Sequence, residues 1–148
     1  FPCSIRSMDA KVVWSTGLSF TGSAAGSGFS LPLGADPKVG GANDGFRPLE
    51  LLLDALPGCT GMDAISILSK NRKEGTTFEV RAHADMASDH PHVYTKVVLE
   101  YVLEGKDIDR ESVQRAVELS ETKYCGAQAM LRKAAPIELK ITINGETG

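Results

Sequence analysis

The sequence predicts an α+β protein in which strands and helices occupy separate stretches of the chain. Three observations indicate this class: period-2 alternation of apolar residues near both ends and in the middle, a long apolar helical segment after residue 47, and amphipathic helical spacing between residues 109 and 133. The length of 148 residues fits one compact domain with a sizeable core.

The alternation of apolar residues in the N-terminal segment predicts a hairpin of two half-buried strands. Its apolar side chains fall on even positions around a break at residues 15–17: Val12, Trp14, Leu18 and Phe20. Residues 29–33 form another short extended piece, and residues 34–45 contain glycines and a proline but almost no large apolar side chain. We therefore expect a loop there and no helix before residue 47.

Pro48 suits the first turn of a helix, since its missing N–H would have no partner there. The residues that follow are apolar on all sides, which predicts a helix buried on most faces. Pro57-Gly58 should interrupt it, and helical spacing resumes at Cys59 until a solvated end at residues 70–73.

Residue patterns in the second half of the chain predict two antiparallel strands, two helices and a last strand. The strands cover residues 77–84 and 93–103, with the side chains of Phe78, Val80 and Ala82 on one face. A helix opens at Asp109, and its inward stripe consists of Val113, Ala116, Val117 and Ser120. A short helix begins at Cys125 and ends at residue 133, and alternation over residues 137–143 predicts the final strand, in an architecture built on antiparallel strands.

Composition and charge exclude several classes of protein. The apolar share of 42% argues against disorder, and no apolar run approaches the ~18 residues that span a bilayer. The net charge is −3 with scattered Lys and Arg, which argues against a nucleic-acid groove. The odd number of three Cys in a chain that needs no disulfide indicates a reducing, cytoplasmic setting.

Two of these cysteines carry the candidate chemistry. We expect residues 1–7 to be an expression scar or leader remnant, because the chain starts without Met and Met8 is a plausible initiator; the single domain is then 8–148, and Cys3 is set aside. Cys59 and Cys125 both begin predicted helical segments, where free N–H groups favour a thiolate. The alternative is that both are small buried apolar residues.

Asp63 opposes a reactive Cys59. It lies four residues further on, hence on the same helical face, and its carboxylate disfavours a nearby thiolate unless a cation offsets it.

Other motifs are weaker. His90 and His92 could hold zinc but lack the spacing of common zinc sites, so a polar turn with stacked or capping rings is the simpler interpretation, and His83 should face solvent. Neither a GxxxxGK[ST] loop nor a GxSxG elbow is present. We therefore expect no cofactor and no metal.

Two segments resemble motifs of a known family. Residues 47–63, RPLELLLDALPGCTGMD, resemble the central-helix motif of the OsmC/Ohr family (osmotically inducible protein C and organic hydroperoxide resistance protein). Residues 120–131, SETKYCGAQAML, resemble the family's second cysteine motif, and residues 91–105 also look similar. The likeness spans about 47–143 and is closer to the less characterised OsmC-like branch than to Ohr proper.

The resemblance implies a homodimer in which antiparallel sheets interlock around long central helices. It also implies a peroxidase for organic hydroperoxides: Cys59 would attack the O–O bond and become a sulfenic acid, and Cys125 would condense with it to a disulfide. An external dithiol, of the lipoyl type in Ohr members, would then reduce the disulfide.

The family's Glu–Arg pair is only partly matched. Peroxidase members have Glu directly after the Pro, where this chain has Leu49, and the carboxylate follows as Glu50. Arg47 is the one nearby candidate for the arginine. Cys59, Cys125, Glu50 and Arg47 are thus the candidate catalytic residues, and the alternative function is a stress-response dimer that binds a small apolar ligand without peroxide turnover.

Overall fold

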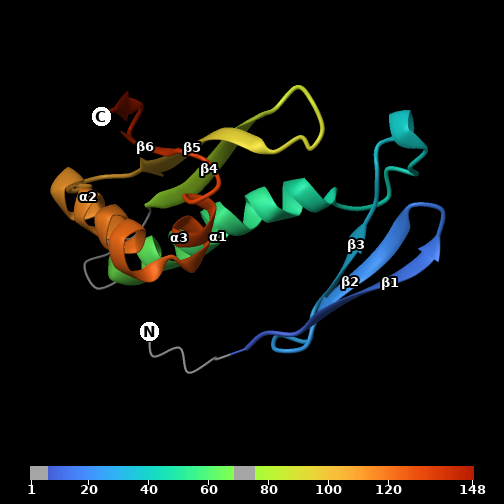
Figure 1. Ribbon diagram of the computed structural model, residues 1–148. Helices are drawn as coiled ribbons and strands as arrows, with labels where there is room; N and C mark the ends of the chain where they lie inside the picture. Colours follow the sequence, from blue (N-terminus) through green and yellow to red (C-terminus); the bar gives the residue numbers. More distant parts are fainter. Residues whose placement is uncertain (1–6, 69–75) are drawn as a thin grey trace. The chain divides into compact units, whose positions relative to one another are not determined.

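A computed structural model describes residues 7–68 and 76–148 of the chain (Figure 1). It confirms the α+β class and divides into two compact units, the first ending at Leu52 and the second covering Leu53–Gly148, which are described separately. Residues 1–6, with Cys3, and the expected helix end at 70–73 lie outside the described residues. The single domain over 8–148 stays a prediction.

The first unit is a three-stranded antiparallel sheet of β1 (Ala10–Thr16), β2 (Ser19–Ala24) and β3 (Ser30–Leu33). The predicted hairpin is confirmed: β1 pairs with β2 around Gly17, which takes a φ of +53° that a glycine tolerates easily. The expected loop after β3 contains one 3₁₀ turn, η1 (Pro37–Val39), capped by Asp36, although the sequence predicted no helix there.

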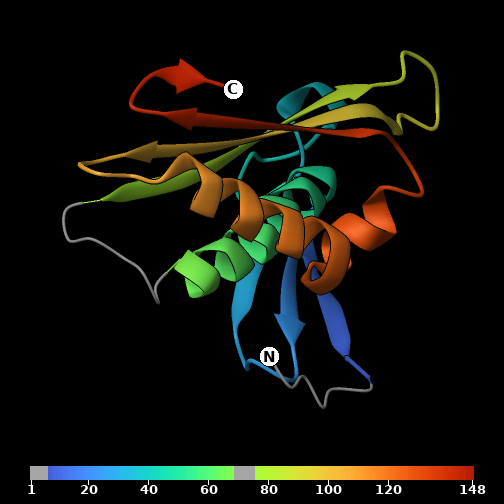
Figure 2. The ribbon, with the colours of Figure 1, turned by 90° about the vertical axis from the view of Figure 1, so that its left-hand side faces the viewer.

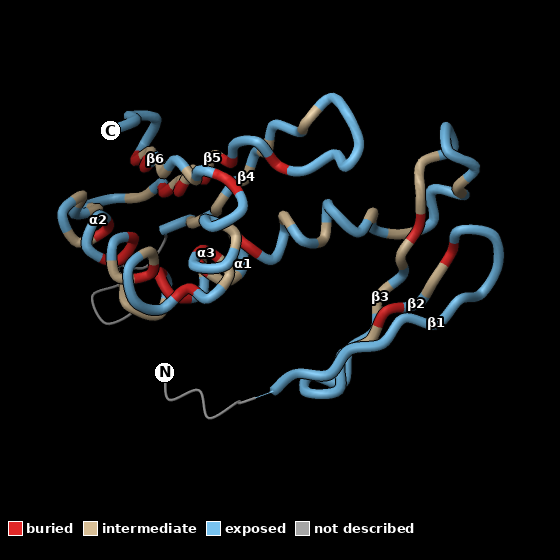
Figure 3. Tube along the Cα trace, viewed as in Figure 1, coloured by how far each residue is buried: buried red, intermediate tan, exposed pale blue. Residues whose placement is uncertain are grey.

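The strands of this unit are less buried than their alternation predicted. Every residue of β1 is exposed, and Trp14 keeps 62% of its surface accessible (Figure 3). The period-2 pattern therefore marks apolar side chains that the sheet of the first unit does not itself bury.

The second unit has a four-stranded sheet in the order β4 (Thr77–Met86), β5 (Tyr94–Glu104), β6 (Ile137–Ile143) and β7 (Glu146–Thr147). The predicted antiparallel pairing of β4 with β5 is confirmed. Strands β5 and β6, however, run parallel, so this sheet is mixed where the sequence predicted antiparallel strands. The chain between them forms α2 and α3, and such a crossover returns the next strand in the same direction.

Helices cover one face of this sheet (Figure 2). They are α1 (Pro48–Leu68), α2 (Arg110–Leu119), a π-helical turn η3 (Ser120–Tyr124) and α3 (Gly126–Leu131). Helix α2 opens at Asp109 as predicted, and the Asp109 side chain caps it. All four residues of the predicted inward stripe are buried, with Ser120 in η3. The core between these layers is centred on Leu56, Leu99 and Tyr101.

Helix α1 differs from its prediction in two respects. It continues through Pro57 as one helix of 21 residues, so Cys59 lies inside it and not at a new helix start. The proline removes one backbone hydrogen bond, but the remaining helical bonds and the packing of Leu56 persist around it. The helix-end argument for a Cys59 thiolate was therefore wrong.

The helix is also less buried than the sequence predicted: only Leu56, Thr60, Asp63 and Ala64 are buried among its described residues, and Met62 keeps 70% of its surface accessible. By length and composition alone, α1 is long and apolar enough to cross a membrane. Core helices of other proteins meet the same two criteria.

Gly61 allows α1 to approach the sheet closely. A Cβ at this position would lie 3.3 Å from Cγ2 of Val80 and 3.9 Å from Cε1 of Phe78, both on β4. We predict that Gly61→Leu lowers the free energy of unfolding by about 1–3 kcal/mol through overpacking, measured by urea denaturation. Gly58→Leu is the matched control, because nothing lies within 4 Å of its Cβ position. Equal losses in the two variants would contradict close packing at Gly61.

Candidate functional site

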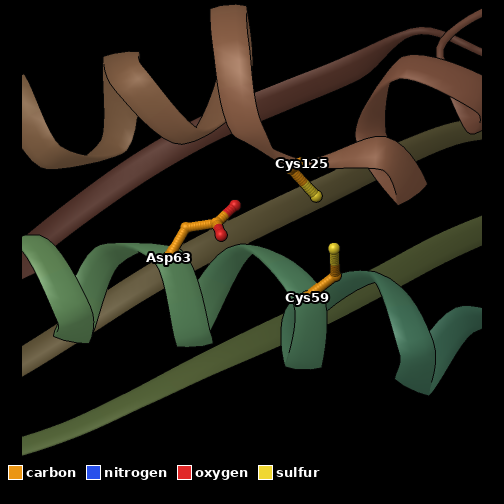
Figure 4. Close-up of side chains that lie close together, drawn as sticks. All are labelled: Cys59, Asp63 and Cys125. Carbon is orange, nitrogen blue, oxygen red and sulfur yellow. The ribbon is translucent and has the colours of Figure 1, made fainter. Parts of the chain in front are cut away.

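The fold brings Cys59 and Cys125 together. Cys59 lies within α1, and Cys125 is the residue that caps the start of α3. The two sulfur atoms and a carboxylate oxygen of Asp63 all lie within 4.8 Å of one another, and Figure 4 shows the three side chains directed toward one another. Both cysteines are free thiols.

Cys125 is the buried member of the pair. Its side chain has 3% of its surface exposed, and its Sγ accepts a hydrogen bond of 3.3 Å from the backbone N–H of Gln128. Burial raises the pKa of the Cys125 thiol to about 12, and the neighbouring Cys59 and Asp63 act in the same direction, against the Gln128 bond. The helix start does not yield the thiolate that its position predicted, because the cost of desolvation outweighs one N–H donor.

Cys59 is only half-buried, so a reagent from solvent can reach it more readily than it can reach Cys125. Asp63 lies one helical turn further along α1, on the same face, as its spacing predicted. Its carboxylate is 8% exposed and forms no ion pair among the described residues.

Arg47 and Glu50 lie in the first unit. They form an ion pair of 3.3 Å at the start of α1, and Arg47 also pairs with Asp36 at 3.3 Å. A further hydrogen bond of 3.1 Å joins Arg47 to the side chain of Asn43. These partly exposed contacts link the loop before α1 to its first turn.

A buried hydrogen-bond network lies beside the sulfurs. The hydroxyl of Thr60 is its centre, 2.7 Å from Oη of Tyr101, 2.8 Å from Oγ of Ser120 and 3.0 Å from Nε2 of Gln128. Ser120 in turn donates to Oδ2 of Asp63 over 2.9 Å. The network thus joins α1, β5, η3 and α3 around the two cysteines.

The bonds of the network have a single consistent direction. The one proton of Ser120 goes to Asp63, so Thr60 must donate to Ser120, and the Tyr101 hydroxyl must donate to Thr60. Gln128 supplies the second donor to Thr60. All three hydroxyl groups donate once, and the chain of donors ends on the Asp63 carboxylate.

The network also reaches a cation. Arg132 donates to Oε1 of Gln128 over 2.8 Å and pairs with Glu121 at 3.2 Å. Gln128 therefore holds Cys125 through its backbone and Thr60 through its side chain, and Arg132 fixes its amide.

Sequence reasoning did not identify Thr60, Tyr101, Gln128 or Arg132 as site residues, and it placed Ser120 only in the inward stripe of a helix. One signal was available: Thr60 and Asp63 are polar residues three positions apart in a mainly apolar helix, and polar residues need partners where such a helix is buried.

The histidines lie apart from this site. The rings of His90 and His92 lie with centroids 4.1 Å apart but are tilted by 53°, so they touch without stacking. His92 bonds the backbone carbonyl of Ala87, which fits the polar turn that the sequence predicted. His83 is exposed beside Asp85, as expected. Within the residues that the structure describes, the one group with three or more potential metal ligands is Cys59, Asp63 and Cys125.

Thr60 tests how strongly this network stabilises the fold. Thr60→Val preserves the shape of the side chain but removes the hydroxyl that Tyr101, Ser120 and Gln128 each bond. The Tyr101 hydroxyl then loses its acceptor, whereas Ser120 keeps its bond to Asp63. We predict a loss of about 2 kcal/mol or more in the free energy of unfolding, since each unsatisfied buried group costs about 1–3 kcal/mol. Thr122→Val is the control, because that residue is exposed and its hydroxyl donates to the backbone carbonyl of Glu118 in the same helical stretch. A loss no larger than the control's would show that the network adds little stability.

Comparison with known proteins agrees with this fold. A family profile described as OsmC-like protein matches residues 41–140. Protein YhfA of Escherichia coli K12 is 35% identical over 130 residues, which cover 88% of this chain and 93% of YhfA.

Two solved structures illustrate the similarity. A hypothetical protein from Aquifex aeolicus superposes with a TM-score of 0.80 at 24% identity, covering 95% of this chain and 98% of that one. An organic hydroperoxide resistance protein OsmC from Legionella pneumophila has a TM-score of 0.68 at 13% identity, covering 94% and 98%. The profile spans more than half of the chain and YhfA most of it: this protein belongs to the OsmC-like family.

Proposed function

We propose that this protein is a thiol-dependent peroxidase that reduces organic hydroperoxides through Cys59 and Cys125. The observation that carries the proposal is the pair of free thiols held within 4.8 Å, one half-buried and one buried. Organic hydroperoxide resistance proteins share the fold, which supports the substrate class.

The chemistry runs in three balanced steps. The Cys59 thiolate attacks the terminal oxygen of the hydroperoxide, the O–O bond breaks, and the alkoxide leaves as an alcohol after taking a proton. Cys59 is then a sulfenic acid. The Cys125 sulfur attacks the Cys59 sulfur, the S–O bond breaks, and the Cys125 proton leaves with the hydroxide as water. A dithiol reduces the resulting disulfide and becomes a disulfide itself.

Exposure supports this division of roles. A hydroperoxide from solvent can meet the half-buried Cys59, whereas Cys125 is covered by its surroundings. Cys125 only has to reach the neighbouring sulfur, a task for which proximity matters more than access. Cys59 is therefore the peroxidatic thiol and Cys125 the resolving thiol.

Arg47 and Glu50 are the proposed electrostatic partners. Their ion pair lies at the first turn of α1, the helix that also carries Cys59. The proposed physiological reductant is a dithiol of the lipoyl type. The proposed compartment is the cytoplasm, whose reducing conditions keep both thiols free.

Peroxide consumption tests the enzyme proposal. Reduced protein carrying Cys3→Ser is mixed with cumene hydroperoxide and dihydrolipoamide in a stopped-flow spectrometer. Cys59→Ser should abolish turnover, because the attacking sulfur is gone, and Cys125→Ser should accumulate a sulfenic acid that dimedone traps. Arg47→Ala and Glu50→Ala should each slow turnover about tenfold or more, because a misplacement of about 1 Å can cost up to about 100-fold in rate. Absence of turnover in the parent protein, or equal rates in Cys59→Ser, would refute the peroxidase.

A second candidate function is the binding of a small apolar ligand. It is favoured by a pocket of about 450 Å³ between α1 and β4, lined by residues that include Pro57, Met62, Ile65, Phe78 and Val80. Cys59 does not line this pocket. A ligand there would bind without using the thiols, so binding with no peroxide turnover would favour this second function.

A homodimer is the proposed assembly. Large apolar side chains are exposed on both units, namely Val12, Val13 and Trp14 on β1 and Leu49, Leu52, Met62 and Ile65 on α1. Exposed apolar surface of this kind is typical of a protein–protein interface.

Sedimentation velocity tests the assembly. We predict a dimer for the parent chain and a shift toward monomer for Trp14→Glu, because a charge on β1 opposes burial of that face. Val39→Glu is the control, since Val39 is equally exposed but lies in η1, outside the sheet. A monomeric parent would refute the dimer, and equal shifts in both variants would exclude β1 as its interface.

A further inference from the structure

Asp63 presents a charge that the fold leaves uncompensated. Its carboxylate is 8% exposed and accepts one hydrogen bond, from Ser120, and in the described part of the chain it has no cationic partner. Buried carboxylates are normally paired with a cation or bound to a metal. The other groups beside it are two thiols, which add negative charge whenever they ionise.

The three groups are arranged as metal ligands. Cys59 Sγ, Cys125 Sγ and a carboxylate oxygen of Asp63 lie within 4.8 Å of one another (Figure 4). Around a tetrahedral zinc ion, with Zn–S near 2.3 Å and Zn–O near 2.1 Å, neighbouring donor atoms are about 3.5–3.8 Å apart. Side-chain movements of about 1 Å would bring the donors to those distances.

The donor set selects the class of metal. Thiolates disfavour Mg²⁺ and Ca²⁺, which prefer oxygen ligands, and two sulfurs with one carboxylate suit Zn²⁺. Two thiolates and a carboxylate carry three negative charges, of which a divalent ion neutralises two. Binding would thus replace two thiol protons with a metal ion and give Asp63 its missing cation.

Outer hydrogen bonds already orient two of the three ligands. Ser120 donates to Oδ2 of Asp63, and the backbone N–H of Gln128 donates to Cys125 Sγ. Thr60 fixes both donors, since it bonds Ser120 and the Gln128 side chain. Metal sites use this kind of outer support to hold ligands in place.

We propose that Cys59, Asp63 and Cys125 of the reduced protein bind one Zn²⁺ ion, with water from the exposed side of Cys59 in the fourth position. The site departs from the expectation of no metal, which rested on the histidines. It does not depend on peroxidase activity. A Cys59–Cys125 disulfide removes both sulfur ligands, so the zinc-bound and disulfide forms exclude each other.

Metal titration tests the site. Reduced, metal-stripped protein carrying Cys3→Ser is titrated with ZnCl₂ against a chromophoric chelator, and with CoCl₂ to record thiolate-to-cobalt absorption. We expect one ion per chain and sulfur charge-transfer bands. Cys59→Ser and Cys125→Ser should each weaken zinc binding at least 100-fold and remove part of the charge-transfer intensity.

Asp63→Asn separates this site from an ordinary dithiol. It should weaken zinc binding at least tenfold, whereas Asp54→Asn, at an exposed position on the same helix, should leave it unchanged. Circular dichroism verifies the fold of each variant. Alkylation of the folded parent protein with iodoacetamide is a second test, and it should abolish zinc binding. Binding of less than one ion, or affinity unaffected by Asp63→Asn or by alkylation, would overturn the proposal, whether or not the protein consumes peroxides.

Discussion

The hydroxyl of Thr60 is the contact on which the rest of the site depends. It is fully buried and joins three other side chains, one each from β5, η3 and α3, to α1. Because a buried hydroxyl without partners costs free energy, these elements have one favourable arrangement relative to each other. That arrangement places Cys125 opposite Cys59. Thr60, which follows Cys59 in the chain, thus positions Cys125, the partner of the candidate nucleophile Cys59.

Helix α1 also has an apolar exposed surface. Inside the second unit it packs through Leu56, Thr60 and Ala64, while residues such as Met62 and Ile65 remain accessible. Because apolar residues lie on both the packed and the accessible sides of α1, the sequence pattern predicted a helix buried on most sides. Burial of the accessible side of α1 in a dimer would account for the apolar residues there, which connects them to the proposed assembly.

Asp63 distinguishes this site from a simple pair of thiols. The donor chain from Tyr101 through Thr60 and Ser120 ends on its carboxylate, which stabilises the anion without neutralising it. The proposed peroxide chemistry at Cys59 would proceed beside this negative charge, whereas a bound divalent cation would be stabilised by it. The same three residues therefore suit two states, a reduced metal site and a disulfide, that cannot coexist.

Local patterns in the sequence determined much of the fold. Alternation and helix-start residues predicted the first hairpin, the β4–β5 pair and the start of helix α2 at Asp109, because these features depend on neighbours in the chain. Motif similarity predicted the family and named Cys59 and Cys125. The helical spacing of Asp63 placed it correctly beside Cys59.

Only the tertiary structure decided the features that join distant segments. The parallel pairing of β5 with β6, the distance between sulfurs 66 residues apart in sequence, and the partners of Thr60 all depend on how the chain packs. The continuity of α1 through Pro57 and the raised pKa of Cys125 were mispredicted for the same reason. Helix bonds and burial come from the whole unit, and they outweigh the local effects of a proline or a helix start.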